Sequence, residues 1–475
     1  MSNTDSPNEE SILHSLDEIH EEIRQIYLSY PYPWVVGYSG GKDSTTALQL
    51  VWYALAGLPP EQRQKPVYVI STDTLVETPV IVDYIDDTLR RIGEQAVKCE
   101  MPFRTEKLKP VLNDTYWVNL IGRGYPAPTN IFRWCTERLK INPSNRFILD
   151  RVAESGEVLL VLGMRSGESA RRDRVMQRYH FLGHVLSKHS RLPGAWVYTP
   201  IEQFSTDDVW TYLLQVPSPW GGDNRSLASL YRSSQDGECP LVVDDTTPPC
   251  GNSRFGCWVC TLVDRDRSME AMIDSGEEWM IPLLEFRDWL ASTQDPAVKP
   301  QQREYKGRNG RVRITDRGLL WRTYKLDFSK EMLRRLLETQ AEIQEHDLDF
   351  VLIGEDELRE IRRLWLTERQ DWEDSLPGIH TEVTGQTIDW DYNDVSMPSR
   401  LELVLLQRVT RKYDVPVRLP QKLIDAEWQY YGMRRRGRIH KTIEKILGED
   451  WRTLDEIQAA IALRQQQANR ADETT

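Results

Sequence analysis

The loop Ser39-Gly40-Gly41-Lys42-Asp43-Ser44 constrains the fold of this chain more than any other short segment. The apolar residues 34–36 before it are typical of a buried strand, and the apolar spacing of residues 45–52 after it indicates a helix. A loop between a strand and a helix N-terminus presents free backbone N–H groups, and a pair of glycines lets that backbone approach an anion closely. Because Lys42 adds a cation, the pattern predicts a phosphate-binding loop. It is not a Walker A loop, in which serine or threonine directly follows the lysine.

The composition is typical of a protein in aqueous solution with more than one domain. The 475 residues are enough for two domains, 28% of them are charged, and the net charge is −13. No apolar run approaches the length of a membrane span, and the polar start is no signal peptide, so we expect a cytoplasmic protein without membrane contact. The acidic balance argues against nucleic-acid binding by the whole surface, although local basic patches remain compatible with it. The six cysteines favour metal binding or catalysis over disulfides in such a compartment.

Strand and helix patterns alternate through the first half of the chain. Residues 67–71 and 157–163 are apolar runs typical of buried strands, and helical patterns separate them. Such alternation predicts an α/β fold with a doubly wound parallel sheet, whose ligands lie at the carboxyl ends of the strands. The pattern becomes mostly helical and charged from about residue 269. We therefore expect an N-terminal helix (residues 1–30), a nucleotide-binding domain (31–268) and a mostly helical C-terminal domain (269–475).

Each predicted strand ends in a polar loop, and these loops resemble a known set of motifs. Residues 71–79 read S-T-D-T-L-V-E-T-P, and residues 163–172 read G-M-R-S-G-E-S-A-R-R. Thr199-Pro200-Ile201 and Asp207-Asp208-Val209-Trp210 follow. Together with the glycine-rich loop, this order and spacing resemble the phosphoadenylylsulfate reductase superfamily of PP-loop ATP pyrophosphatases over about residues 30–265.

This resemblance implies that ATP is cleaved between its α and β phosphates, with Mg²⁺. It implies that Asp73 lies near the ribose or the metal, and that Arg165 and Arg171 lie near phosphates, a role that suits paired arginines. Taken singly, each arginine is more typical of a surface ion pair. The implied nucleotide-binding residues are Ser39, Gly40, Gly41, Lys42, Asp43, Ser44, Asp73, Gly163, Arg165 and Arg171.

Four cysteines lie together in a segment rich in glycine and proline, residues 239–260. Cys239, Cys250, Cys257 and Cys260 have the spacing C-x10-C-x6-C-x2-C, which suits either a tetrahedral zinc or a [4Fe–4S] cluster. The spacing does not choose between the two metals. The reductase resemblance favours iron–sulfur, because many relatives hold a cluster through a C-x-x-C at this place, and zinc is the alternative.

Two further features separate the chain from the sulfonucleotide reductases. Cys135 stands alone where those reductases have paired cysteines, and no cysteine follows Cys260, where they carry a catalytic thiol on a mobile tail. The layout instead resembles the DndC family, the ATP-pyrophosphatase-like sulfur-transfer proteins of bacterial DNA phosphorothioation. That resemblance implies adenylation of a DNA phosphate oxygen and its replacement by sulfur. The implied partners are a cysteine desulfurase, other DNA phosphorothioation proteins and double-stranded DNA.

Cys135 is the candidate for relaying sulfur, because only it and Cys99 lie outside the group of four cysteines. A role as a small buried hydrophobic residue is an equally good interpretation of Cys135 and a better one of Cys99. The predicted catalytic set is Lys42, Asp43, Asp73, Cys135 and Arg165. Two other classes remain open: a sulfonucleotide reductase or tRNA-thiolating enzyme, and a non-enzymatic iron–sulfur scaffold or sensor.

Two basic segments are candidates for DNA contact. Residues 303–325 carry eight arginines or lysines against two acidic residues, and the interleaved Tyr305, Trp321 and Tyr324 suit base or sugar contacts beside phosphate binding. The second segment follows Tyr430 and Tyr431 and contains Arg434, Arg435, Arg436, Arg438, His440 and Lys441. Charge runs are usually solvated faces or docking sites for acidic partners.

Overall fold

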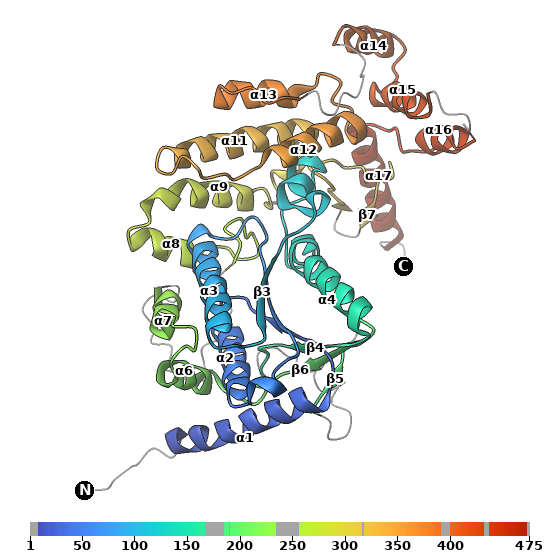
Figure 1. Cartoon of the computed structure of the whole chain (residues 1–475). Coiled ribbons are helices and arrows are strands. Elements are labelled where there is room, and N and C mark those ends of the chain that lie inside the picture. Colours follow the sequence, from blue (N-terminus) through green and yellow to red (C-terminus); the bar gives the residue numbers. More distant parts are fainter. Residues whose placement is uncertain are drawn as a thin grey trace. The chain divides into compact units, whose positions relative to one another are not determined.

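The fold is described from a computed structural model (Figure 1), in which the structure describes residues 8–166, 185–189, 191–233, 256–315, 318–390, 400–431 and 437–472. Four groups of predicted functional residues lie outside these ranges: Arg171, Cys239, Cys250 and residues 434–436. No helix in the described ranges combines the length and the apolar character that crossing a membrane requires. The chain divides into two compact units, of which unit 1 is Met1–Val111 with Thr129–Leu284 and unit 2 is Leu112–Pro128 with Glu285–Thr475.

Unit 1 is built on a six-stranded sheet with the order β3-β2-β1-β4-β6-β5. All neighbouring strands are parallel except β5, which pairs antiparallel with β6 at one edge. Trp34 of β1 is in register with Val67 of β2 and with Leu159 of β4. This sheet confirms the predicted α/β class. The strands are β1 (Trp34–Gly37), β2 (Val67–Thr72), β3 (Phe103–Leu108), β4 (Val158–Val161), β5 (Ser187–Lys188) and β6 (Ala195–Tyr198).

Helices cover both faces of the sheet, because its central strands are apolar on both sides. Figure 1 shows α4 (Asn142–Ser155) on one side of the sheet and α2 (Lys42–Ala56) and α3 (Pro79–Lys98) on the other. The strand order reverses between β1 and β4, and this switch point is where open α/β sheets bind ligands. The other α-helices that the structure describes in this unit are α1 (Asn8–Ser29), α6 (Thr206–Gln215), α7 (Asn224–Ser233) and α8 (Arg267–Asp274).

Unit 2 is mostly helical, as the sequence predicts for the C-terminal half. Its core is formed by buried side chains of α11 and α12, among them Leu333, Leu336, Ile361 and Trp365. Two short strands, β7 (Ile314–Thr315) and β8 (Gly318–Leu319), form a hairpin. The helices are α9 (Ile281–Ser292), which crosses the border between the units, α10 (Lys299–Gln302), α11 (Leu326–Gln344), α12 (Glu355–Glu368), α13 (Ser375–Thr384), α14 (Arg400–Lys412), α15 (Arg418–Tyr430), α16 (Ile439–Leu447) and α17 (Leu454–Asp472).

Residues 112–128 belong to unit 2, although they lie between β3 and α4 along the chain. They contain a π-helical turn, η3 (Val118–Gly122), which packs on α12. Trp365 Nε1 donates a hydrogen bond to Ile121 O at 3.0 Å, and Trp117 Nε1 donates one to Leu352 O at 2.7 Å. The observed division therefore differs from the expected border at residue 268, since unit 1 excludes this segment and continues to Leu284.

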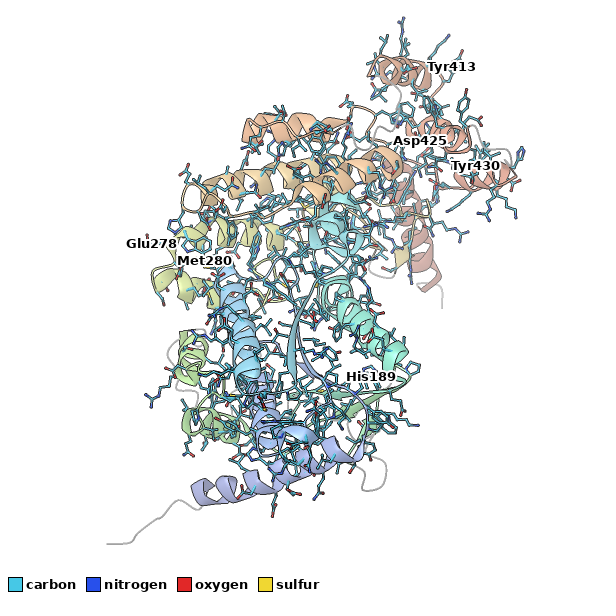
Figure 2. All side chains as sticks on the ribbon, viewed as in Figure 1. His189, Glu278, Met280, Tyr413, Asp425 and Tyr430 are labelled. Carbon is cyan, nitrogen blue, oxygen red and sulfur yellow. The ribbon has the colours of Figure 1, made fainter. Side chains whose placement is uncertain are left out.

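The C-terminal helices of unit 2 are joined to it through polar as well as apolar contacts. Asp425 and Tyr430 lie on α15, and Tyr413 follows α14 (Figure 2). Asp425 accepts a hydrogen bond from Trp372 Nε1 at 3.0 Å, and burial raises the pKa of this carboxyl group to about 6. The contact fixes α15 to the segment that follows α12.

Candidate functional site

A cavity of about 570 Å³ opens at the carboxyl ends of β1, β2 and β4 in unit 1. Its apolar lining residues include Ile70, Ile148, Leu160 and Leu162. The polar lining residues come from the glycine-rich loop and the start of α2, from the end of β2 and the loop after it, and from the segment before α4 and its first turn: Ser39, Gly41, Asp43, Thr72, Glu77, Lys140 and Ser144. The volume is that of a small-molecule site, and the two kinds of lining residue suit a ligand with both a ring system and charged groups.

The glycine-rich loop is shaped by its own hydrogen bonds. Gly40 has a φ of +74°, a conformation that L side chains rarely adopt. Ser44 Oγ donates to Gly41 O at 2.9 Å and accepts from Ser39 N at 3.3 Å. Thr45 Oγ1 donates to the same Gly41 oxygen at 2.9 Å. These bonds fix the turn that brings the N-terminus of α2 to the cavity, which is the geometry an anion site requires.

Asp43 lies between two cations at the start of α2. Its Oδ2 is 3.0 Å from Lys42 Nζ, and its Oδ1 is 2.7 Å from Arg165 Nε. Arg165 is buried and also donates to Thr206 Oγ1 at 3.2 Å, so it holds Asp43 in place beside the cavity. Gly163 permits this arrangement, because a Cβ there would lie 2.5 Å from the backbone oxygen of Asp43.

Asp73 faces partners other than the glycine-rich loop. Its Oδ1 accepts from Leu75 N at 2.8 Å, and its Oδ2 lies 3.2 Å from Lys107 Nζ and 3.9 Å from Lys109 Nζ. Asp73 is not among the residues that line the cavity, whereas Thr72 and Glu77 on either side of it are. In this structure the carboxylate of Asp73 is thus held by lysines of β3 and the residue after it.

Glu77 and Lys140 connect the cavity to the cysteines. Lys140 Nζ lies 3.2 Å from Glu77 Oε1, which also accepts from Thr74 Oγ1 at 3.1 Å. Thr74 Oγ1 is in turn 3.3 Å from Cys257 Sγ. Burial alone would lower the pKa of Lys140, but the neighbouring Cys257, Glu77 and Cys135 raise the pKa above its usual value. Lys140 is therefore a stable cation beside both the cavity and the thiols.

The C-x-x-C segment is attached to the loop after β2 by backbone hydrogen bonds. Thr78 donates to Gly256 O through its backbone N at 3.1 Å and through its Oγ1 at 2.9 Å, and Trp258 N donates to Val76 O at 3.0 Å. Burial, together with the charge of Glu77, raises the pKa of the Cys257 thiol to about 12. Cys257 is therefore held beside the loop after β2, whose Glu77 lines the cavity.

Cys135 precedes the π-helical turn η4 (Thr136–Ile141) and is half-buried. Burial raises the pKa of its thiol, and the neighbouring Cys260 raises it further. The structure thus brings together three of the predicted cysteines, Cys135, Cys257 and Cys260. Within the ranges that the structure describes, no three Cys, His, Asp or Glu side chains are grouped closely enough to hold a metal ion. The predicted ligands Cys239 and Cys250 lie outside those ranges.

Glu77 and Lys140 are the residues that the sequence analysis did not single out. Glu77 lies within the S-T-D-T-L-V-E-T-P string, and Lys140 ends the run Arg133-Trp134-Cys135-Thr136-Glu137-Arg138-Leu139-Lys140. The available signal in the sequence was a pair of opposite charges, one within the string of residues 71–79 and one in the run that contains Cys135. The sequence does not show that these two charges form a pair, because the two segments meet only in the tertiary structure.

The basic segment 303–325 lies in unit 2, and the structure divides its cations by role. The guanidinium group of the buried Arg303 lies 5.1 Å from the centre of the Tyr324 ring and donates to Thr293 O at 3.2 Å. Lys325 Nζ donates to Pro300 O at 2.9 Å. These two residues hold the segment in place, whereas Arg311 and Arg313 are exposed. In the second basic segment, Arg438, His440 and Lys441 are described, and residues 434–436 are not.

Comparison with known families agrees with the fold of unit 1. Residues 33–262 match the model of the phosphoadenosine phosphosulfate reductase domain. An uncharacterized protein of Methanocaldococcus jannaschii is 26% identical over 242 residues, which cover 51% of this chain and 39% of that protein. The chain therefore spans well under half the length of this relative.

Similar solved structures come from several enzymes. A phosphoadenylyl-sulfate reductase from Candida auris has 15% identity and a TM-score of 0.27, covering 44% of this chain and 88% of that one. An FMN adenylyltransferase from Candida glabrata has 13% identity and a TM-score of 0.27, covering 46% and 60%. A U34-tRNA thiolase from Methanococcus maripaludis, solved with its [4Fe–4S] cluster, has 14% identity and a TM-score of 0.29, covering 60% and 80%.

Proposed function

We propose, from the match of residues 33–262 to a phosphoadenosine phosphosulfate reductase domain, that this protein is an ATP pyrophosphatase-type sulfurtransferase of DNA backbone phosphorothioation. A non-bridging phosphate oxygen is a poor leaving group. Transfer of AMP from ATP to that oxygen releases pyrophosphate and converts the oxygen into part of a good leaving group. The terminal sulfur of a cysteine persulfide then attacks phosphorus, and AMP departs with the oxygen. A second thiol breaks the S–S bond, which leaves the sulfur on phosphorus and converts the two thiols into a disulfide.

The observation that carries this proposal is the shared position of Glu77 and Lys140. Both residues line the nucleotide-sized cavity, and both lie beside the cysteines. Activation of a phosphate and delivery of sulfur require the two reactions to meet at one phosphorus atom. A cation between the cavity and the thiols would stabilise negative charge on either side.

The remaining roles follow from the cavity walls. The glycine-rich loop would hold the pyrophosphate of ATP, and the apolar lining residues suit the purine ring. Lys42 is not among the residues that line the cavity, but it lies against Asp43, which is, and would add its charge to this site. Asp43 and Glu77 offer carboxylate oxygens for the Mg²⁺ that accompanies the phosphates. Cys135 would receive sulfur from a cysteine desulfurase, since it is half-buried beside Cys260 and close to Lys140.

We also propose that Cys239, Cys250, Cys257 and Cys260 hold a [4Fe–4S] cluster, with zinc as the alternative. Two of these four cysteines, Cys257 and Cys260, are described by the structure, and they fit a metal centre as partly exposed thiols of one tight turn, in which Cys260 N donates to Cys257 O at 3.1 Å. Coordination would deprotonate them. Lys140 would offset the charge of the thiolates. Such a cluster would supply electron transfer or a rigid anchor for the loop.

The nucleotide chemistry is tested by the products formed from ATP in the presence of Mg²⁺ and DNA. We expect AMP and pyrophosphate from the wild-type protein. Lys42→Ala should lower the rate on the order of 10²-fold, because it removes a fixed charge from the phosphate site. Lys98→Ala changes an exposed lysine at the end of α3 and is the matched control, with a rate like that of the wild type. Formation of ADP and orthophosphate, or an unchanged rate in Lys42→Ala, would exclude the proposal.

A further inference from the structure

Unit 2 contains a second cavity, of about 700 Å³, which the proposed ATP chemistry does not use. Its walls come from the basic segment 303–325, the end of α12 and residues 416–453. Arginines and lysines outnumber glutamates by seven to three among its lining residues. In a chain with a net charge of −13, such a concentration of cations around one cavity favours an anionic ligand.

Some of these cations are neutralised within the protein. Arg418 lies 2.8 Å from Glu304, and Lys422 lies 2.6 Å from Glu449. Arg452 lies 2.6 Å from Asp450, a residue next to the cavity wall. These pairs involve two of the three glutamates that line the cavity, whereas the exposed Glu368 takes part in none of the three pairs, and they leave other cations of the lining outside these pairs.

Lys306 and Arg308 are two further cations of the cavity lining. Within the described ranges, neither is within ion-pair distance of a carboxylate. Arg308 donates to Arg123 O at 3.2 Å, and its guanidinium carbon lies 4.6 Å from the centre of the Tyr125 ring. Lys306 Nζ lies over the ring of Trp451 at 4.9 Å. Contacts with carbonyls and ring faces orient a cation without neutralising it.

Arg369 adds a fixed positive charge to the same wall. Its guanidinium donates to Ile121 O at 3.1 Å, Tyr324 O at 2.6 Å and Ser329 Oγ at 2.8 Å. Burial lowers the pKa of Arg369 to about 10, and the nearby Arg418 and Arg308 lower it as well, while Glu304 and Asp371 oppose this effect. A bound anion would relieve the repulsion among these guanidinium groups.

Two aromatic rings stand at fixed positions beside the cations. Tyr305 Oη donates to Arg452 O at 3.0 Å, and Trp451 Nε1 donates to Ile446 O at 3.0 Å. Aromatic faces next to phosphate-binding cations are the combination with which proteins hold a single nucleotide of a strand. The cavity volume is large enough for one such unit.

We propose that this cavity binds one nucleotide unit, with its phosphate at Lys306 and Arg308 and its base against Trp451 or Tyr305. The unit is either a free nucleotide or a nucleotide within a DNA strand. The choice of DNA as one source rests on the proposed function. Binding of a nucleotide by this cavity does not depend on the ATP chemistry proposed for unit 1.

The test is fluorescence anisotropy of a labelled 12-nucleotide oligo-dT with the full-length protein. Arg308→Ala and Lys306→Ala should each weaken binding about tenfold and lower the slope of log affinity against log salt by about 0.7, the value expected for one phosphate contact on a single strand. Trp451→Leu should weaken binding about fivefold or more through lost stacking. Arg313→Ala is the matched control, since Arg313 belongs to the same segment, is exposed and does not line the cavity. It should change the affinity less than twofold.

Competition with dTMP distinguishes the two sources. Displacement of the oligonucleotide by dTMP would support a site for free nucleotides, and failure of dTMP to displace it would support a site for a strand. Absence of binding of both the oligonucleotide and dTMP, or an equal loss in Arg313→Ala and Arg308→Ala, would overturn the proposal. Thermal unfolding of each variant reports on folding, and formation of AMP and pyrophosphate reports separately on the proposed function.

Discussion

At Gly163 the backbone after β4 passes directly against the start of α2. A Cβ at this position would lie 2.5 Å from the carbonyl oxygen of Asp43 and 2.8 Å from the nitrogen of Ser44. Both are backbone atoms of the glycine-rich loop, so they would have to move. Gly163→Ala should therefore destabilise unit 1 by about 1–3 kcal/mol, as overpacking does. It should also lower ATP cleavage on the order of 10²-fold, because a small displacement of the loop misaligns the phosphates.

Gly93→Ala is the control for this prediction. Gly93 lies within α3, and a Cβ there would be 3.6 Å from Thr105 Oγ1, an ordinary contact. Alanine at this helical position should leave ATP cleavage unchanged and raise the stability by about 0.5–1 kcal/mol. Thermal unfolding and product formation measured side by side check both variants. Equal behaviour of Gly163→Ala and Gly93→Ala would show that the contact with Asp43 is unimportant.

At the scale of elements, the C-x-x-C segment should be the site where metal binding and local structure depend on each other. Wild-type protein purified without oxygen should be brown and absorb at about 400 nm, as iron–thiolate clusters do. Cys257→Ser or Cys260→Ser should abolish both iron binding and this absorption. The physical reason is that each thiolate supplies one ligand on a loop that residues 74–78 hold in place. Iron and sulfide analysis together with the absorption spectrum measures the effect.

Cys99→Ser provides the matched comparison, because Cys99 is exposed at the C-terminus of α3. It should retain the iron content of the wild type. Colourless wild-type protein with one stoichiometric zinc would instead favour the structural zinc alternative.

The elements also show what the sequence predicts and what it does not. The strands β1, β2 and β4 were predictable because central strands of a parallel sheet are buried on both faces and read as apolar runs. β3 was not, because it lies at the edge of the sheet and carries Arg104, Glu106 and Lys107. The glycine-rich loop was predictable from local spacing alone. The pairing of Glu77 with Lys140 was not, because it joins segments that only the folded chain brings together.

At the scale of the whole molecule, the expected domains and the two observed units differ mainly at residues 112–128. A division by order along the chain assigns them to the first domain, yet their backbone carbonyls accept hydrogen bonds from Trp365 and Arg369 of unit 2. Gly122 of this segment also packs closely on α12, because a Cβ at Gly122 would lie only 2.9 Å from Leu364 Cδ1. The chain thus passes between the two units more than once, and the strands β3 and β4 of unit 1 are separated in sequence by a segment that belongs to unit 2.

The sulfur content of DNA from the host organism tests the central claim of sulfur transfer most directly. Deletion of the gene should remove phosphorothioate linkages, which nuclease digestion and mass spectrometry detect as sulfur-containing dinucleotides. Reintroduction of the wild type or of Cys99→Ser should restore them, whereas Lys42→Ala and Cys135→Ser should not, because they lack the phosphate-site cation and the proposed sulfur acceptor. Unchanged phosphorothioate in the deletion strain, or full restoration by Cys135→Ser and Lys42→Ala, would contradict the account.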